Sequence, residues 1–203
     1  LANLDHVAAR ECLRCLQHLS ANTRIPMLYV SHNIEEVCQL ADHLLLLESG
    51  RVTEQGSLLD LCSRLDTRLS REEQAAAIIT GTISGQDESF GLTELDIGGH
   101  ILRVSQLRLP AGQSRRIRIP ARDVSVCRER PRNSSILNIF PVTIEELEDT
   151  TAPRLLLRLS LGRQYLLARI TRRSAFELGL QKNDHVYAQI KSAALLTGPT
   201  DAV

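Results

Sequence analysis

Residues 142–171, "VTIEELEDTTAPRLLLRLSLGRQYLLARIT", alternate apolar and polar side chains over short runs that are broken by an acidic loop and by a glycine turn. Alternation with a period of two is typical of half-buried β-strands, and Gly, Asp and Pro clusters mark the turns between them. The stretch therefore predicts short β-strands joined by turns.

A similar arrangement stands earlier in the chain, over residues 81–124. Each copy has a strand, an acidic loop, a strand, a glycine turn, a strand, a polar turn and a final strand. The offset between copies grows from 61 residues at Thr82 and Thr143 to 71 at Ile119 and Ile190. The second copy thus carries an insertion, largely a short helix predicted over 172–180. From Ile78 onward we predict an all-β barrel or sandwich, either two related five-strand barrels or one barrel built from both halves.

The first part of the chain alternates between helical and strand patterns, and strands joined by helices imply an α/β fold with a parallel sheet. The polar, charged stretch "DTRLSREEQAAA" separates it from the β-rich part and predicts a linker. The expected elements are helices over 7–20, 33–41 and 57–65 and strands over 26–30, 43–49 and 50–56. The expected domains are 1–65, a linker at 66–77, barrel halves at 78–133 and 134–197, and a tail at 198–203.

The formal net charge is zero, but the charge is unevenly spread along the 203 residues. Residues 1–99 carry 7 basic and 15 acidic side chains, and residues 100–133 carry 9 basic and 2 acidic ones. The basic segment is an anion or nucleic-acid patch or, alternatively, a solvated strand face. Single-strand-binding barrels stack bases on exposed aromatic rings. With three Phe, three Tyr and no Trp, the chain is expected to bind no nucleic acid.

Five cysteines without an even framework indicate a reducing compartment. Cys12 and Cys15 share one helical stripe with Ala8, Leu16 and Leu19, which predicts core positions rather than a redox or metal pair. No metal site is expected. The longest wholly aliphatic run, residues 44–47, is far shorter than the roughly 20 residues of a membrane span.

A polar histidine, His32, stands at the carboxyl end of the strand predicted over 26–30. Open α/β sheets place their ligand sites at that edge. A neutral imidazole there can donate an N–H to a phosphate oxygen while a neighbour orients its other nitrogen.

Two stretches, "LANLDHVAARE" (1–11) and "YVSHNIEEVCQLADHLLLLESGRVTEQG" (29–56), resemble the end of an ABC-transporter ATP-binding domain. The resemblance implies that Leu4 and Asp5 belong to the D-loop and, with Ser31, lie at the nucleotide interface. It also implies that His32 is the catalytic switch histidine that senses the γ-phosphate, with ATP and magnesium as cofactors.

Three other elements of that family are absent: a G-x-x-x-x-G-K-[ST] phosphate loop, an LSGGQ-like signature and an aliphatic strand that ends in Asp-Glu. The chain therefore resembles the carboxyl-terminal part of a longer ATPase. Alone, it is expected to hydrolyse no ATP.

Three further motifs, "SSILNIFPVTI" (134–144), "LARITRRSAFEL" (167–178) and "VYAQIKSAALL" (186–196), resemble a molbindin or TOBE-like domain, an OB-like barrel that binds molybdate or tungstate. Leu137 occupies a position that is arginine in some members, and the family's glycine near Pro141 or Val142 is absent. A tetrahedral dianion only accepts hydrogen bonds, so its site needs several O–H and N–H donors and about one positive charge. The resemblance places the oxyanion-binding positions, in a site between two copies, on Ser135, Thr171, Ser174, Lys191 and Ser192, with backbone amides near Asn138 contributing.

These resemblances predict part of the ATP-hydrolysing subunit of a bacterial molybdate ABC importer, followed by a regulatory oxyanion-binding barrel. Its partners would be a second ATP-binding subunit, membrane permease subunits and, indirectly, a molybdate-binding protein outside the membrane. It would be cytoplasmic, held at the inner face of the cell membrane by the permease. The alternatives are an ABC ATPase for another solute (sulfate, iron or sugar), a stand-alone module that stores or senses oxyanions, and a nucleic-acid-binding barrel.

Overall fold

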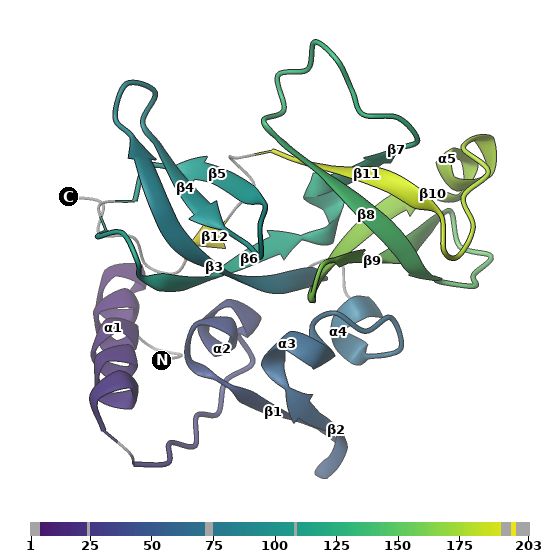
Figure 1. Ribbon diagram of the computed structural model, residues 1–203. Helices are drawn as coiled ribbons and strands as arrows, with labels where there is room; N and C mark the ends of the chain where they lie inside the picture. Colours follow the sequence, from purple (N-terminus) through teal and green to yellow (C-terminus); the bar gives the residue numbers. More distant parts are fainter. Residues whose placement is uncertain (1–4, 24, 72–74, 108, 192–195, 198–203) are drawn as a thin grey trace. The chain divides into compact units, whose positions relative to one another are not determined.

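A computed structural model describes the chain except for residues 1–4, 24, 72–74, 108, 192–195 and 198–203 (Figure 1). The chain divides into two compact units, residues 1–58 and 59–203. Each unit is built from local signals that the sequence carries.

The first unit holds two helices and a β-hairpin, close to the predicted bounds. Helix α1 (His6–Asn22) begins at Asp5, whose carboxylate accepts two backbone N–H groups at 2.9 Å. Helix α2 (Ile34–Leu40) follows, and β1 (His43–Glu48) pairs antiparallel with β2 (Arg51–Ser57). Ser49 and Gly50 both have positive φ, 49° and 76°, as a two-residue hairpin turn requires.

The parallel sheet predicted for this unit is not formed. Residues 26–30 are not a strand, and Leu28 and Val30 are 84% and 85% exposed. A strand needs a hydrogen-bonded neighbour, and among the described residues none pairs with this segment. The predicted core stripe of α1 is also wrong in part: Cys15 is exposed and Cys12 half-buried, whereas Leu13 is buried.

The stretch expected to link the two parts contains ordered, buried structure. The predicted helix over 57–65 is shortened to α3 (Leu58–Leu61), and α4 (Arg68–Arg71) follows it. The buried Ser70 hydroxyl donates to the carbonyl of Leu65 at 2.6 Å, and the Ser70 carbonyl accepts from Arg169 at 2.8 Å. A small cluster joins this segment to the β-structure, consisting of Leu65, Ala75, Ala77, Ala121, Leu156 and Leu167.

The second unit contains two five-stranded antiparallel sheets, ordered β12-β6-β3-β4-β5 and β10-β9-β8-β11-β7. The strand and helix bounds are β3 (Ala76–Asp87), β4 (Leu92–Asp96), β5 (Ile101–Ser105), β6 (Ser114–Pro120), η1 (Ala121–Asp123), β7 (Val124–Cys127), β8 (Asn138–Leu147), β9 (Arg154–Leu161), β10 (Gln164–Thr171), α5 (Arg172–Glu177), β11 (His185–Ile190) and β12 (Leu196–Thr197).

The internal repeat is confirmed, because the two sheets have matching strand orders. Strand β3 is interrupted by a bulge between Ile83 and Gly85, and β8 by one between Ile144 and Glu146. These bulges are offset by the 61 residues that relate Thr82 to Thr143. The helix predicted in the insertion is α5.

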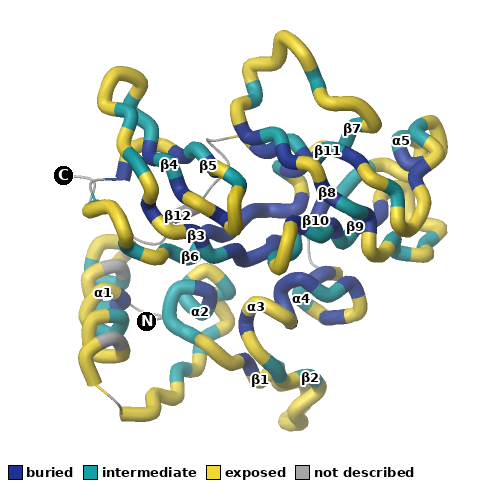
Figure 2. The backbone as a smooth tube through the Cα atoms, in the orientation of Figure 1, coloured by how far each residue is buried: buried dark blue, intermediate teal, exposed yellow. Residues whose placement is uncertain are grey.

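Each sheet takes its fifth strand from the other repeat. Strand β7 precedes the second repeat yet pairs with β11, and β12 follows that repeat yet pairs with β6. Both sheets contribute to one hydrophobic cluster, and Figure 2 draws its residues in dark blue along with the other buried residues of the chain. The unit is therefore built from both halves together, with the boundary expected at 133/134 crossed by exchanged strands.

Two amide side chains join the sheets where their edges meet. Asn138, which is fully buried, accepts the backbone N–H of Arg103 at 2.7 Å and donates to its carbonyl at 2.8 Å. Gln164 does the same with the N–H and carbonyl of Thr80, at 2.6 and 2.9 Å. Each amide thus takes the place of a strand neighbour and satisfies backbone groups that the ladder leaves open.

Candidate functional site

His32 is exposed and follows an extended segment in which Tyr29 and Ser31 are bound to α2. Glu36 accepts hydrogen bonds from the hydroxyl of Tyr29 at 2.6 Å, the hydroxyl of Ser31 at 2.8 Å and the amide of Asn33 at 3.3 Å. Asn33 also caps α2 by accepting the N–H of Glu35 at 3.0 Å. The turn that carries His32 is therefore tied on both sides to the helix that follows it.

These contacts shift two pKa values in opposite directions. The hydrogen bond from Tyr29 is the main influence that lowers the pKa of Glu36, with Ser31 adding to it. Burial and the neighbouring Glu36 carboxylate raise the pKa of Tyr29 to about 12. The pair is thus a neutral phenol that donates to a carboxylate over the whole neutral range.

Of the other residues predicted at the nucleotide interface, Asp5 has a local role as the cap of α1. Ser31 both donates to Glu36 and accepts the backbone N–H of Asn33 at 3.1 Å. Leu4 lies outside the described residues. Asp5 and His32 thus belong to separate local networks of the first unit.

Thr171 and Ser174, predicted to bind the oxyanion, lie at the start of α5. The Thr171 hydroxyl accepts the backbone N–H of Ser174 at 3.0 Å, and the two hydroxyl oxygens are 2.7 Å apart. This pair caps the helix, since a threonine at that position satisfies an N–H that the helix leaves open. Thr171 is exposed and Ser174 half-buried, so both hydroxyls can also meet a ligand.

The remaining predicted oxyanion residues lie near the paired ends of β8 and β11. Asn138 pairs with Ile190 across these strands, and Lys191 follows directly. Lys191 and Ser135 are exposed, and Ser192 lies outside the described residues. The side chain of Asn138 is buried against Arg103, so only its backbone neighbourhood remains for the role that the sequence suggested.

The strand register separates these two groups of residues. Asn138 lies at the first end of β8. The last residue of β8, Leu147, pairs with Leu157 of β9, and Arg154, at the same end of β9, pairs with Thr171. Thr171 and Ser174 therefore lie at the opposite end of the sheet from Lys191. One copy of the barrel does not bring all the predicted donors together.

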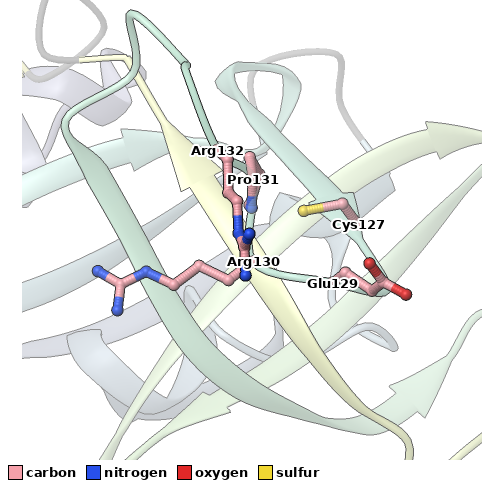
Figure 3. Close-up of a pocket in the computed structure, with 5 residues that line it drawn as sticks. All are labelled: Cys127, Glu129, Arg130, Pro131 and Arg132. Carbon is pink, nitrogen blue, oxygen red and sulfur yellow. The ribbon is translucent and has the colours of Figure 1, made fainter.

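The segment after β7 forms an arginine-rich loop that the sequence marked only by its charge. Arg128 donates to the carbonyl of Leu178 at 2.8 Å and forms an ion pair with the carboxylate of Asp184 at 2.8 Å. The pKa of Asp184 is lowered, mainly by a hydrogen bond from the backbone N–H of Gln181 and next by Arg128. Beyond it lies an open pocket, whose side chains Figure 3 shows pointing in different directions. Its lining residues are Cys127, Glu129, Arg130, Pro131 and Arg132.

Within the described part of the chain, no three His, Cys, Asp or Glu side chains gather so that they could hold a metal ion. No described helix is both long and apolar enough to cross a membrane.

Residues 134–196 match the TOBE domain family. Over 97% of its length the chain is 41% identical to the molybdenum import ATP-binding protein ModC of Aromatoleum aromaticum and 43% identical to that of Pseudomonas aeruginosa. The chain is thus similar to molybdenum import ATP-binding proteins. It spans about half the length of these curated relatives, covering 52% and 55% of them.

A solved structure resembles the TOBE-containing unit. The cytoplasmic molybdate-binding protein ModG, solved with molybdate bound, matches with a TM-score of 0.53 and 26% identity. The match covers 60% of this chain and 94% of that one. Together with the strand layout, it supports the OB-like barrel fold expected for this TOBE-containing chain.

Proposed function

We propose that the chain is part of the ATP-hydrolysing subunit of a molybdate ABC importer and that its barrel binds molybdate or tungstate as a regulatory ligand. The observation that carries this proposal is the identity of about 40% with molybdenum import ATP-binding proteins over nearly the whole chain. The likeness of the second unit to a molybdate-binding protein supports the ligand.

In this function His32 contacts the γ-phosphate of ATP, and magnesium is the counter-ion of the ATP phosphates. ATP supplies the free energy of transport when it is bound and hydrolysed. The exposed imidazole ring of His32 can donate one N–H to a phosphate oxygen, while the bonds of Ser31 and Asn33 to Glu36 hold the backbone on both sides of His32. No phosphate loop is present in the sequence, so the 203-residue chain alone is expected to show no ATP hydrolysis.

The oxyanion site lies between two barrels. Thr171 and Ser174 of one copy would meet Lys191 of the other, since one barrel holds them at opposite ends of a sheet. Two hydroxyls and one ammonium provide donors and a positive charge for a dianion that only accepts. A pair of subunits joined in this way, bound to permease subunits at the membrane, would sense the oxyanion in the cytoplasm.

Calorimetry of the purified chain with molybdate, tungstate and sulfate tests the ligand. We expect molybdate and tungstate to bind more tightly than sulfate. Lys191→Ala should weaken binding about 10- to 150-fold, because a hydrogen bond to a charged group contributes about 1.5–3 kcal/mol. The chain has one other lysine, and Lys182→Ala is the matched control that should bind normally. Absence of heat with every oxyanion, or equal affinity in both lysine variants, would contradict the proposed site.

A further inference from the structure

Three hydrogen-bond donors from alternate residues converge on one carboxylate. Tyr29, Ser31 and Asn33 all donate to Glu36, at 2.6, 2.8 and 3.3 Å. All three side chains therefore reach the same carboxylate of α2, although the backbone bends at His32 and Asn33 is already the cap of that helix.

The neighbouring residues that do not bind Glu36 are exposed. Leu28 and Val30 are 84% and 85% exposed, and His32 is exposed as well, whereas Tyr29 and Ser31 are half-buried. The position of the imidazole is thus set by the neighbours on either side of it. Both of those neighbours are bound to Glu36.

We propose that Glu36 is the positioning residue for His32: by binding Tyr29, Ser31 and Asn33 it holds the 31–33 turn so that the imidazole is presented on the exposed side. This inference rests on the proposed role of His32 in ATP turnover. A carboxylate suits the task because it accepts several bonds and donates none, and such charge-assisted bonds are stronger than neutral ones. A glutamine has a single acceptor oxygen, and its NH₂ group would confront the same donors.

The first test measures kcat and KM for ATP in the full-length transporter subunit that contains this chain. Glu36→Gln should lower kcat on the order of 10- to 100-fold, the effect of misplacing a catalytic group by about an ångström, with little change in KM. Glu35→Gln, which removes the same charge from the same turn of α2, should remain near wild type. Tyr29→Phe, which removes one of the three bonds, should cause a smaller loss and serves if Glu36→Gln does not fold.

The second test separates positioning from a general structural role. In the His32→Ala background, Glu36→Gln should cause no further loss of turnover, because no imidazole remains to be positioned. An additive loss would overturn the proposal. If His32→Ala itself leaves turnover unchanged, the proposed function of His32 fails, and the role of Glu36 fails with it. If His32→Ala is inactive but Glu36→Gln and Tyr29→Phe are fully active, only the positioning role is refuted.

A third measurement uses the 203-residue chain and needs no activity. The backbone N–H of Asn33 is bound to the Ser31 hydroxyl, which Glu36 holds in place. Glu36→Gln should therefore speed hydrogen exchange at that amide, while exchange within α1 stays as in wild type. Unchanged exchange at Asn33 would overturn the proposal whatever the kinetics show.

Discussion

At the scale of single residues, the molecule uses short polar side chains to fix backbone that regular structure leaves unpaired. Asn138 and Gln164 each bind both the N–H and the carbonyl of a residue in the other sheet. The side chain of Asn138 therefore belongs to the framework of the barrel, and the prediction that backbone amides near it contact the oxyanion stays a prediction. Lys191, directly after β11, and Thr171, the cap of α5, are exposed.

The hydrogen-bonded pair of Tyr29 and Glu36 stabilises the first unit over a limited pH range, which follows from the shifts of the two pKa values. The pKa of Glu36 is lowered, so its contribution to stability is present above the ordinary value of 4.5 and is lost as the pH falls below it. The pKa of Tyr29 is raised from 10.0 to about 12, so its contribution is present below pH 10 and is lost as the pH rises toward 12.

Absorbance of tyrosinate during a rapid alkaline titration checks this assignment. One of the three tyrosines should titrate near pH 12, and Tyr29→Phe should remove that component. Glu36→Gln should move it toward the ordinary value of 10, while Glu35→Gln leaves it in place. Simultaneous titration of all tyrosines near 10 in the wild-type chain would contradict the network.

At the scale of elements, the first sheet of the barrel contains a close approach between β3 and the end of β4. A Cβ atom at Gly81 would lie 2.9 Å from Cγ2 of Ile97 and 3.1 Å from Cβ of Leu95, both of which are buried. Gly85, at the bulge of the same strand, has more room, since its nearest neighbour would be the Glu94 carboxylate at 3.4 Å. The bend of β3 toward β4 thus requires a glycine at one position and only tolerates one at the other.

Thermal or urea unfolding of two alanine variants checks this difference. Gly81→Ala should lower the free energy of unfolding by about 1–3 kcal/mol, the usual cost of forcing an extra carbon into a packed core. Gly85→Ala should change it by about 0.5 kcal/mol or less, as substitutions outside packed cores do. Equal effects of the two substitutions would show that the contacts at Gly81 can relax freely.

At the scale of the whole molecule, the proposed oxyanion site needs two barrels, so binding and self-association should be linked. Large apolar side chains lie exposed beside both groups of donors: Phe176, 86% exposed, next to Thr171 and Ser174, and Leu137 between Ser135 and Asn138. A second copy would cover them. Each oxyanion held between copies stabilises the dimer by its free energy of binding.

Sedimentation velocity of the 203-residue chain with and without molybdate checks that linkage. Molybdate should shift the chain toward a dimer, and sulfate at the same concentration should do so less. Phe176→Glu should weaken the dimer at least about tenfold, since it places a charge in an apolar contact. Phe90→Glu is the matched control, because Phe90 is 79% exposed on a distant hairpin. Molybdate binding by a strictly monomeric chain would contradict a shared site.

The sequence predicted the repeat, its bulge-related offset and α5, because alternation and turn residues are local signals. It also predicted α1, α2 and the strands β1 and β2, but not their antiparallel pairing. It failed where pairing over long distances decides the outcome. Residues 26–30 have the composition of a buried strand but no described partner, and β7 joins the repeat that follows it. The bonds between the Asn138 side chain and the backbone of Arg103, 35 residues away in the chain, are another long-range contact without a local signal.

The reciprocal exchange of β7 and β12 has a consequence for how the protein is made on the ribosome. Cys127 pairs with Tyr187, which is synthesised 60 residues later. The backbone of Thr80 binds Gln164, which is synthesised 84 residues later. Neither repeat can complete its five-stranded sheet before nearly all of the chain has emerged. Folds dominated by such distant pairings form slowly and expose strand edges meanwhile. The nascent barrel therefore keeps unpaired strand edges until its last strands leave the exit tunnel.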